Sequence, residues 1–161
     1  DIVKAFPDLA GGSFTTEKSK VIGKPGTTCG TPGTQKAKTV ATTGVSAAGQ
    51  PVVVAMVADL KSAGKTKTYL SRYKKFAKAC ANFTEPTTGA QITMKKVKAP
   101  KVGQKALAFE QTTSIMGITS YSATVVIRQG KRISSLVAID DAPISSKSIK
   151  KLAKVAAKKM K

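Results

Sequence analysis

Histidine and tryptophan are absent from this 161-residue chain, and its 28 lysines and arginines far outnumber its eight acidic residues. The absence of histidine excludes Ser-His and Cys-His nucleophiles, histidine-ligated zinc and imidazole proton relays. Acid–base catalysis needs two placed carboxylates, but the neighbours Asp140 and Asp141 would point to opposite faces of a strand. The sequence therefore predicts a protein that is not an enzyme and that has no metal site and no cofactor.

Cysteine is nearly absent too, since Cys29 and Cys80 are the only two in the chain. Two cysteines without histidine cannot complete a four-ligand zinc site, and their spacing is far from Cys-x-x-Cys. A single disulfide and two free thiols both remain open, and we favour the disulfide, which is typical of exported proteins. In the chain-entropy model such a bond would contribute roughly 4 kcal/mol to stability.

Long apolar runs are also missing. No stretch approaches the ~20 residues needed to cross a bilayer, so no transmembrane helix is predicted. The opening residues, Asp1 to Lys4, lack the pattern of a signal peptide and would fit a trimmed mature form. The length and a hydrophobic fraction of 41% predict one globular, extracytoplasmic domain over 1–161. We expect an extracellular or cell-envelope location, either secreted or lipid-anchored.

Two segments have the apolar periodicity of a helix. In 64–83, an aromatic stripe recurs at spacings of three and four residues and includes Cys80, which would point toward the core. Such a stripe would shield a disulfide. In 145–160, Ser145 or Ser146 can cap the helix, an apolar stripe runs along one side, and lysines cover the other.

Six segments are predicted to be strands, and Gln129-Gly130 has the signal of a two-residue hairpin between the last two. The run 51–58 is continuously apolar, which predicts a central, buried strand. The elements together predict an α+β fold, in which an antiparallel sheet of about five to six strands is packed by the two main helices. The predicted strands are 36–47, 51–58, 91–98, 105–112, 118–128 and 131–140.

The tripeptide Gly64-Lys65-Thr66 follows an apolar strand, as it does in the phosphate-binding loop of nucleotide-hydrolysing enzymes. Asp59 occupies the position at which that motif needs its first glycine, and a carboxylate there would repel phosphate. We therefore predict that this tripeptide is the ordinary start of the first main helix.

The formal net charge of +20 allows two interpretations, a solvated surface and a surface that binds anionic polymers. Only three of the basic residues are arginines, and few aromatic side chains are free to stack on bases, so specific nucleic-acid recognition is not expected. Peripheral contact with a membrane surface stays open for the last helix, although its apolar side has no bulky aromatic anchor. The residues predicted to bind a polyanion are Lys147, Lys150, Lys151, Lys154 and Lys158.

Three segments carry a resemblance to a known group of proteins: FAKAC at 76–80, VGQKALAFEQTTS at 102–114 and YSATVVIRQGKRISSLVAIDD at 121–141. In their order they resemble the exported sensor-type domains and lipoproteins of actinobacteria, which include the extracellular domain of PknH-like serine/threonine kinases. In that group a helix ending in cysteine is disulfide-linked, and phrases like the second and third segments form adjacent strands. The chain departs from the group in allowing one disulfide rather than two, in having Phe76 where tryptophan is common, and in its excess of lysine.

The resemblance implies an α+β fold with a cleft on the sheet and a non-enzymatic, sensor-like binding role outside the membrane. The ligand would be a small molecule or a cell-envelope component, and we expect a monomer. The alternative is a charge-driven protein that binds an anionic envelope polymer or, without specificity, nucleic acid. We predict a cleft on the sheet face opposite the helices, where a merely solvated face is the competing interpretation. The residues predicted to line it are Ser122, Thr124, Arg128, Arg132 and Ser134.

Overall fold

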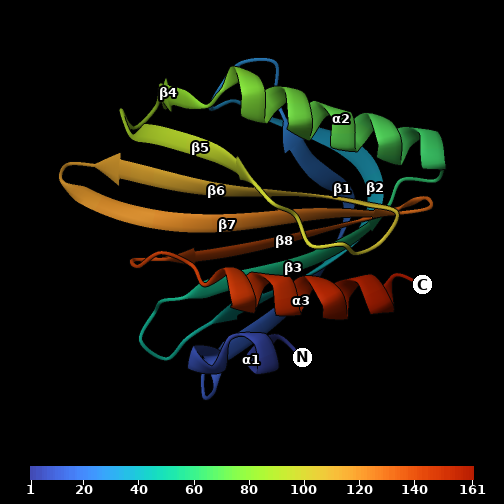
Figure 1. The fold of residues 1–161 in the computed structure, drawn as a ribbon, viewed down its shortest axis with the longest axis horizontal. Coiled ribbons are helices and arrows are strands. Elements are labelled where there is room, and N and C mark those ends of the chain that lie inside the picture. The colour runs from blue at the N-terminus through green and yellow to red at the C-terminus, as the bar shows by residue number, and fades with distance from the viewer.

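The computed structural model describes all of residues 1–161 and contains one eight-stranded sheet with the order β1-β2-β3-β8-β7-β6-β5-β4 (Figure 1). All neighbouring strands are antiparallel. The predicted α+β class and antiparallel sheet are confirmed, but the predicted five to six strands are corrected to eight. The strands are β1 (Ser13–Pro25), β2 (Pro32–Val45), β3 (Val52–Asp59), β4 (Asn82–Thr84), β5 (Gln91–Val97), β6 (Lys105–Ile115), β7 (Ile118–Gln129) and β8 (Arg132–Asp140).

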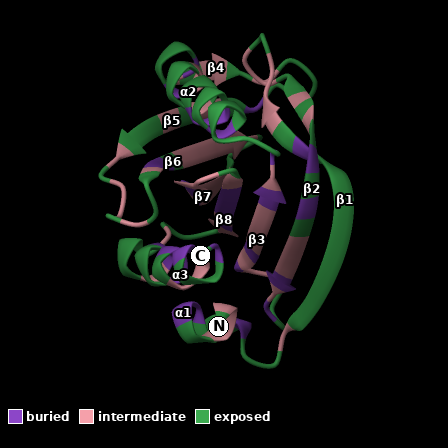
Figure 2. Ribbon diagram, turned by 90° about the vertical axis from the view of Figure 1, so that its right-hand side faces the viewer, coloured by how far each residue is buried: buried purple, intermediate pink, exposed green.

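The two unpredicted strands, β1 and β4, both lie at edges of the sheet. β1 is exposed on both faces from Ser13 to Val21, so its sequence has no alternation of apolar and polar residues to indicate a strand. Figure 2 shows this exposure along most of its length. This part of β1 is ordered by its backbone pairing with β2, and burial contributes only beyond it, at Ile22. β4 is only three residues long, too short for a periodic pattern.

The helices begin as the sequence predicts. The side chain of Ser62 accepts a hydrogen bond from the backbone N–H of Lys65, and Ser145 caps the last helix in the same way. The first main helix ends short of the predicted residue 83, because the chain turns after Cys80 and enters β4. No helix is both long and apolar enough to span a membrane. The helices are α1 (Ile2–Ala5), a 3-10 helix (Pro7–Leu9), α2 (Ala63–Ala79) and α3 (Ser146–Lys159).

The helices α2 and α3 cover opposite faces of the sheet (Figures 1 and 2). On β7, Val125 belongs to the apolar cluster that contains Leu152 of α3, whereas its neighbour Val126 belongs to the cluster that contains Tyr69 of α2. Successive residues of a strand point to opposite faces, so each helix packs on its own face. The expectation of one sheet face free of both helices is therefore wrong. Both faces of the central strands are apolar, so each face is shielded from water by a helix.

The tripeptide Gly64-Lys65-Thr66 lies in the first turn of α2, as predicted for an ordinary helix start. Thr66 is fully buried, and its hydroxyl lies 2.7 Å from the carbonyl oxygen of Gly130 and 2.9 Å from that of Ala63. Thr66 therefore ties the start of α2 to the turn between β7 and β8. A threonine used in this way is not available to a bound phosphate.

The turn between β4 and β5 is organised by Glu85. Its carboxylate accepts hydrogen bonds from the Thr88 hydroxyl at 2.6 Å and from the backbone N–H groups of Thr88 at 2.7 Å and Thr87 at 3.0 Å. These hydrogen bonds lower the pKa of Glu85 from 4.5 to about 2, and the bond from the Thr88 hydroxyl makes the largest contribution. The turn is therefore held by an ionised side chain.

We expect this carboxylate to stabilise the fold above pH 4.5, and the stabilisation to be lost as the pH falls toward 2, because the folded protein binds the proton less readily than the unfolded chain. Carbon-detected NMR of the Glu85 carboxyl group should give a midpoint near 2. In Thr88→Val the midpoint should move up toward 4.5, since the first cause of the shift is removed. An unchanged midpoint in that variant would contradict the assignment.

Candidate functional site

An apolar pocket of about 520 Å3 lies between α1, α3 and the sheet face that α3 covers. Its volume falls in the usual range for ligand sites, ~300–1,000 Å3. Phe14 and Val40 in its wall are exposed at 44% and 45%. Few other large hydrophobic side chains in this protein are as exposed. The fold thus leaves apolar surface uncovered here. The lining residues are Asp1, Ile2, Val3, Phe14, Val40, Thr42, Ala55, Met56, Val57, Ser134, Leu136, Leu152, Val155, Ala156 and Lys159.

The floor of this pocket is built by strand register. Val57 of β3 pairs with Ser134 of β8 on one side and with Val40 of β2 on the other. Val40 pairs in turn with Lys18 of β1. Residues paired in this way share a face of the sheet, so the four side chains form one row across the floor. The row ends in a lysine at the outer strand.

Just outside the lining residues, at one end of the floor, the same sheet face is basic. The next row in register consists of Arg132, Asp59 and Lys38. Asp59 forms a salt bridge with Lys131 at 3.1 Å. Its pKa is lowered, first by a hydrogen bond from the backbone N–H of Lys61 and then by the bond with Lys131. Asp59 also interacts electrostatically with Arg132, so one carboxylate stands among the cations Lys131, Arg132 and Lys38, and this end keeps a positive net charge.

The other end of the floor is apolar and closed by Phe14. A side chain on Gly44 would place its Cβ 2.6 Å from the Phe14 ring and 3.3 Å from Leu9, so only glycine lets the ring lie against the strand. Phe14 and Gly44 are register partners, and Gly44 pairs on with Val53 of the core. The pocket therefore runs from an aromatic end to an end that borders the basic row of Arg132 and Lys38.

Ser134 is the one fully buried polar residue in the pocket wall. Its hydroxyl has no hydrogen-bond partner in the protein. An unpaired buried hydroxyl costs about 1–3 kcal/mol, so such groups need an explanation. Ser134 lies at the boundary between the aliphatic floor and the basic row, and it carries the one buried, unpaired polar group among the lining residues.

At the rim, Lys159 of α3 forms a salt bridge with Asp1 at 2.7 Å, and Lys151 donates a hydrogen bond to the carbonyl oxygen of Lys4. These contacts hold α1 against α3, and the two helices lie beside each other in Figure 1. Both ion-paired side chains at the rim are substantially exposed, so the salt bridge itself contributes little stability. The wall that α1 forms is therefore held mainly by apolar packing, through Ala5, Phe6 and Leu9 in the core.

The residues predicted to bind a ligand do not lie together. Alternation places Ser122, Thr124 and Arg128 on the face that α2 covers, and Arg132 and Ser134 on the face that α3 covers. Ser134 lines the apolar pocket, and Arg132 donates a hydrogen bond to the carbonyl oxygen of Met160 near its basic end. The other lining residues were missed, although Phe14, a lone aromatic in a polar stretch, offered a signal.

The lysines predicted for polyanion binding are all exposed on α3. A separate hollow of about 660 Å3 lies between the β1–β2 turn and α2 and is lined by Lys24, Arg72 and Lys75, with no carboxylate. No group of three or more acidic or cysteine side chains could hold a metal ion. The five predicted lysines are Lys147, Lys150, Lys151, Lys154 and Lys158.

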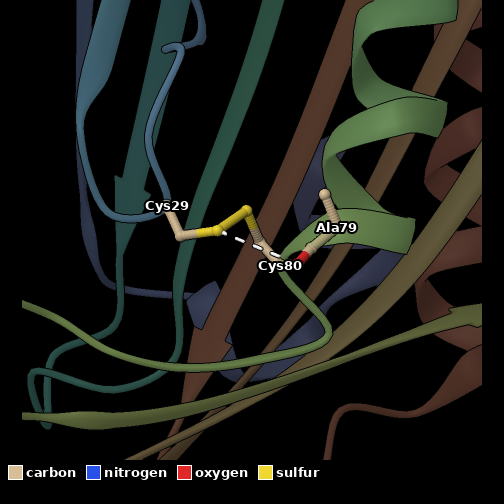
Figure 3. Close-up of a disulfide and its surroundings, with 3 residues drawn as sticks. All are labelled: Cys29, Ala79 and Cys80. Atoms are coloured by element: carbon tan, nitrogen blue, oxygen red, sulfur yellow. Dashed lines mark hydrogen bonds between the residues drawn. A yellow bond between two sulfur atoms is a disulfide. The ribbon is translucent and has the colours of Figure 1, made fainter.

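Cys29 and Cys80 form a disulfide, with their Cα atoms 5.6 Å apart (Figure 3). Cys80 is buried at the end of α2, and Cys29 lies in the turn between β1 and β2. The sulfur of Cys29 lies 4.0 Å from the carbonyl oxygen of Ala79. The bond therefore attaches the outer β1–β2 hairpin to α2, as the aromatic stripe of that helix predicted.

The fold is similar to two solved mycobacterial structures. The extracellular domain of PknH from Mycobacterium tuberculosis superposes with a TM-score of 0.60 at 12% identity, over 98% of this chain and 90% of that one. A putative uncharacterized protein (Rv0999 ortholog) from Mycobacterium smegmatis superposes with a TM-score of 0.54, also at 12% identity, over 97% and 94%. No protein-family model and no curated protein matches the chain.

At this identity the likeness shows the fold and nothing further. The resemblance to PknH-type extracellular domains, which three short segments indicated, is confirmed at the level of the fold. The shared architecture extends over nearly the whole of each chain.

Proposed function

We propose that this chain is a non-enzymatic, extracellular, sensor-like domain that binds a small apolar ligand in the pocket between α1, α3 and the sheet. The observation that carries the proposal is a largely hydrophobic cavity of about 520 Å3 that contains an unpaired buried hydroxyl on Ser134. Pockets with an apolar wall and a few polar groups are the usual form of a small-molecule site.

The location and the sensor-like role have separate support. The disulfide fits an oxidising compartment. The fold is that of the PknH domain, which is extracellular, and the likeness covers nearly the whole chain. Sharing a fold does not transfer an activity, so the binding role depends on the pocket.

A fluorescent dye tests the pocket directly. We expect the uncharged dye N-phenyl-1-naphthylamine to bind with enhanced emission, because burial in an apolar cavity removes it from water. Ala156→Phe places a ring in the wall of the pocket and should weaken dye binding at least tenfold. Ala48→Phe, the same substitution in the exposed β2–β3 loop, should leave the affinity unchanged.

Each variant should first be shown to unfold with the cooperativity of the unmodified chain, so that a lost site is not confused with a lost fold. Binding that persists in Ala156→Phe, or binding that disappears equally in Ala48→Phe, would place the dye elsewhere and refute the proposal.

A second candidate function is attachment to an anionic polymer of the cell envelope. The observation that favours it is the hollow lined by Lys24, Arg72 and Lys75, where three cations converge without an acidic neighbour. The exposed lysines of α3 add charge without such a hollow. Affinity for heparin over a salt series separates the candidates, because polyanion binding weakens steeply with salt whereas dye binding does not.

A further inference from the structure

The floor of the pocket changes character along its length. At one end the ring of Phe14 lies against Gly44, in the row of Val53. Four residues further along β3, Val57 lies in the row of Ser134 and Lys18. In between, the floor offers aliphatic side chains and the hydroxyl of Thr42, which is already hydrogen-bonded to Thr16.

From this gradient we infer that the pocket takes a single extended hydrocarbon chain that ends in an anionic headgroup. This inference rests on the proposed function and names its ligand class. The hydrocarbon lies along the aliphatic floor with its end against Phe14. The headgroup lies at the basic end, between Ser134 and Arg132 on β8 and Lys18, which is three strands away on β1.

The charge around the headgroup position is positive. Lys18 and Lys38 project from the same sheet face as the floor, and Arg132 lies between them and the end of α3. Of the nearby carboxylates, Asp59 is engaged with Lys131 and Asp1 with Lys159. An anion is therefore attracted to this end, whereas a cationic headgroup is repelled.

Ser134 supplies the hydrogen bond that the headgroup needs. Its hydroxyl is fully buried and unpaired, and it is two residues from Arg132 on the same face of β8. It is placed to donate to an oxygen where the hydrocarbon meets the headgroup. The partner that the hydroxyl lacks in the free protein is thus an atom of the ligand.

The length of the floor sets the length of the chain. Four residues of antiparallel strand span about 13 Å. An extended polypeptide advances about 3.3–3.6 Å over the three backbone bonds of a residue, so an extended alkyl chain needs about 12 bonds for the same distance. A free fatty acid and a monoacyl phospholipid of this length share the required chemistry.

Competition against N-phenyl-1-naphthylamine tests the inference on the intact chain. The competitors share one chain length and differ in their headgroup: dodecanoic acid, lauroyl lysophosphatidylglycerol, dodecanol and dodecylamine, all below their micelle concentrations. The acid or the lysolipid should displace the dye at a concentration at least tenfold lower than the amine. Which of these two displaces the dye better identifies the source of the anion.

Two variants locate the headgroup. Ser134→Ala should weaken binding of the better anionic competitor about threefold to tenfold, whereas Ala48→Phe in the exposed β2–β3 loop should leave it unchanged. Lys18→Gln should weaken the anion severalfold, whereas Lys67→Gln, an equal loss of charge on the exposed side of α2, should have no effect. If the two lysine variants weakened binding of the anion equally, its preference would be explained by the net charge of the protein alone, and the inference would be overturned.

The outcomes separate the inference from the proposed function. If the dye binds but no chain displaces it, the ligand class is wrong and the pocket remains a site. If the alcohol and the amine compete as well as the acid, the anionic headgroup is wrong. If the dye does not bind at all, the proposed function fails with the inference.

Discussion

Removal of the Cys29–Cys80 disulfide is expected to lower the free energy of unfolding by about 4 kcal/mol. The two residues are 51 apart in sequence, and the bond removes the corresponding loop entropy from the unfolded chain. A loss of this size is a large fraction of the ~5–15 kcal/mol that stabilises a typical domain. Urea unfolding of the oxidised protein and of the double variant Cys29→Ser, Cys80→Ala measures the difference.

The structure also indicates where this loss should be felt first. Cys29 lies in a turn that packs little of its own surface, whereas Cys80 is buried, which is why alanine is the better replacement at that position. Hydrogen exchange should increase most in the β1–β2 hairpin near residues 26–31. Reduction of the unmodified protein by dithiothreitol is the control, since it breaks the same bond without a substitution. A loss below ~1 kcal/mol in both would show that the unfolded chain gains little freedom.

The elements that the sequence predicted well are those with a buried face. The aromatic stripe of α2 and the apolar run of β3 each leave a local signal in the sequence. The hairpin between β7 and β8 was also expected, although its turn consists of Gly130 and Lys131 rather than Gln129 and Gly130. The disulfide could be expected for the same reason, because Cys80 falls on the buried stripe. The resemblance to a known group added the expected fold, which the superpositions confirm.

The features that could not be predicted from the sequence depend on contacts between residues that are distant in the chain. β1 is an edge strand that is exposed on both faces from Ser13 to Val21, and along this part its register with β2 orders it. Alternation within one strand divides its residues between two faces of the sheet. It does not indicate which face a helix will cover, so the placement of α2 and α3 on opposite faces could not be predicted. For this reason the predicted residues Ser122 and Ser134 were grouped, although they lie on opposite faces.

The candidate site shows the same limit. Phe14, Val57, Ser134 and Lys159 lie on four elements that are far apart in the chain. Their convergence is set by the sheet order, in which β8 is inserted between β3 and β7. A register shift in β1 between Ser19 and Val21 also matters. Because of it, the Ile22 side chain points toward the α2 cluster, whereas Phe14 lies on the α3 face. No local pattern encodes such a change of face.

Truncation of Tyr69 is expected to have the second large effect on stability. Its side chain is fully buried, and its hydroxyl donates a hydrogen bond to the carbonyl oxygen of Gly23 at 2.6 Å. Its ring lies 5.2 Å from that of Tyr73. Tyr69→Ala should therefore cost about 3–5 kcal/mol, as for other buried aromatic residues. Tyr69→Phe keeps the ring and should cost only about 1 kcal/mol, the usual net value of one hydrogen bond.

The dependence of stability on pH in the alkaline range separates the contribution of the Tyr69 hydroxyl from that of its ring. Burial first, and then the neighbouring Tyr73, raise the pKa of Tyr69 above its ordinary value of 10. The folded protein thus keeps a proton that the unfolded chain releases, so the contribution of this group is complete below pH 10 and declines as the pH rises above it. Tyr69→Phe should be less stable than the unmodified protein at pH 7, yet lose less stability between pH 9 and 11. Equal slopes in the two proteins would mean that the Tyr69 hydroxyl reaches water in the folded state.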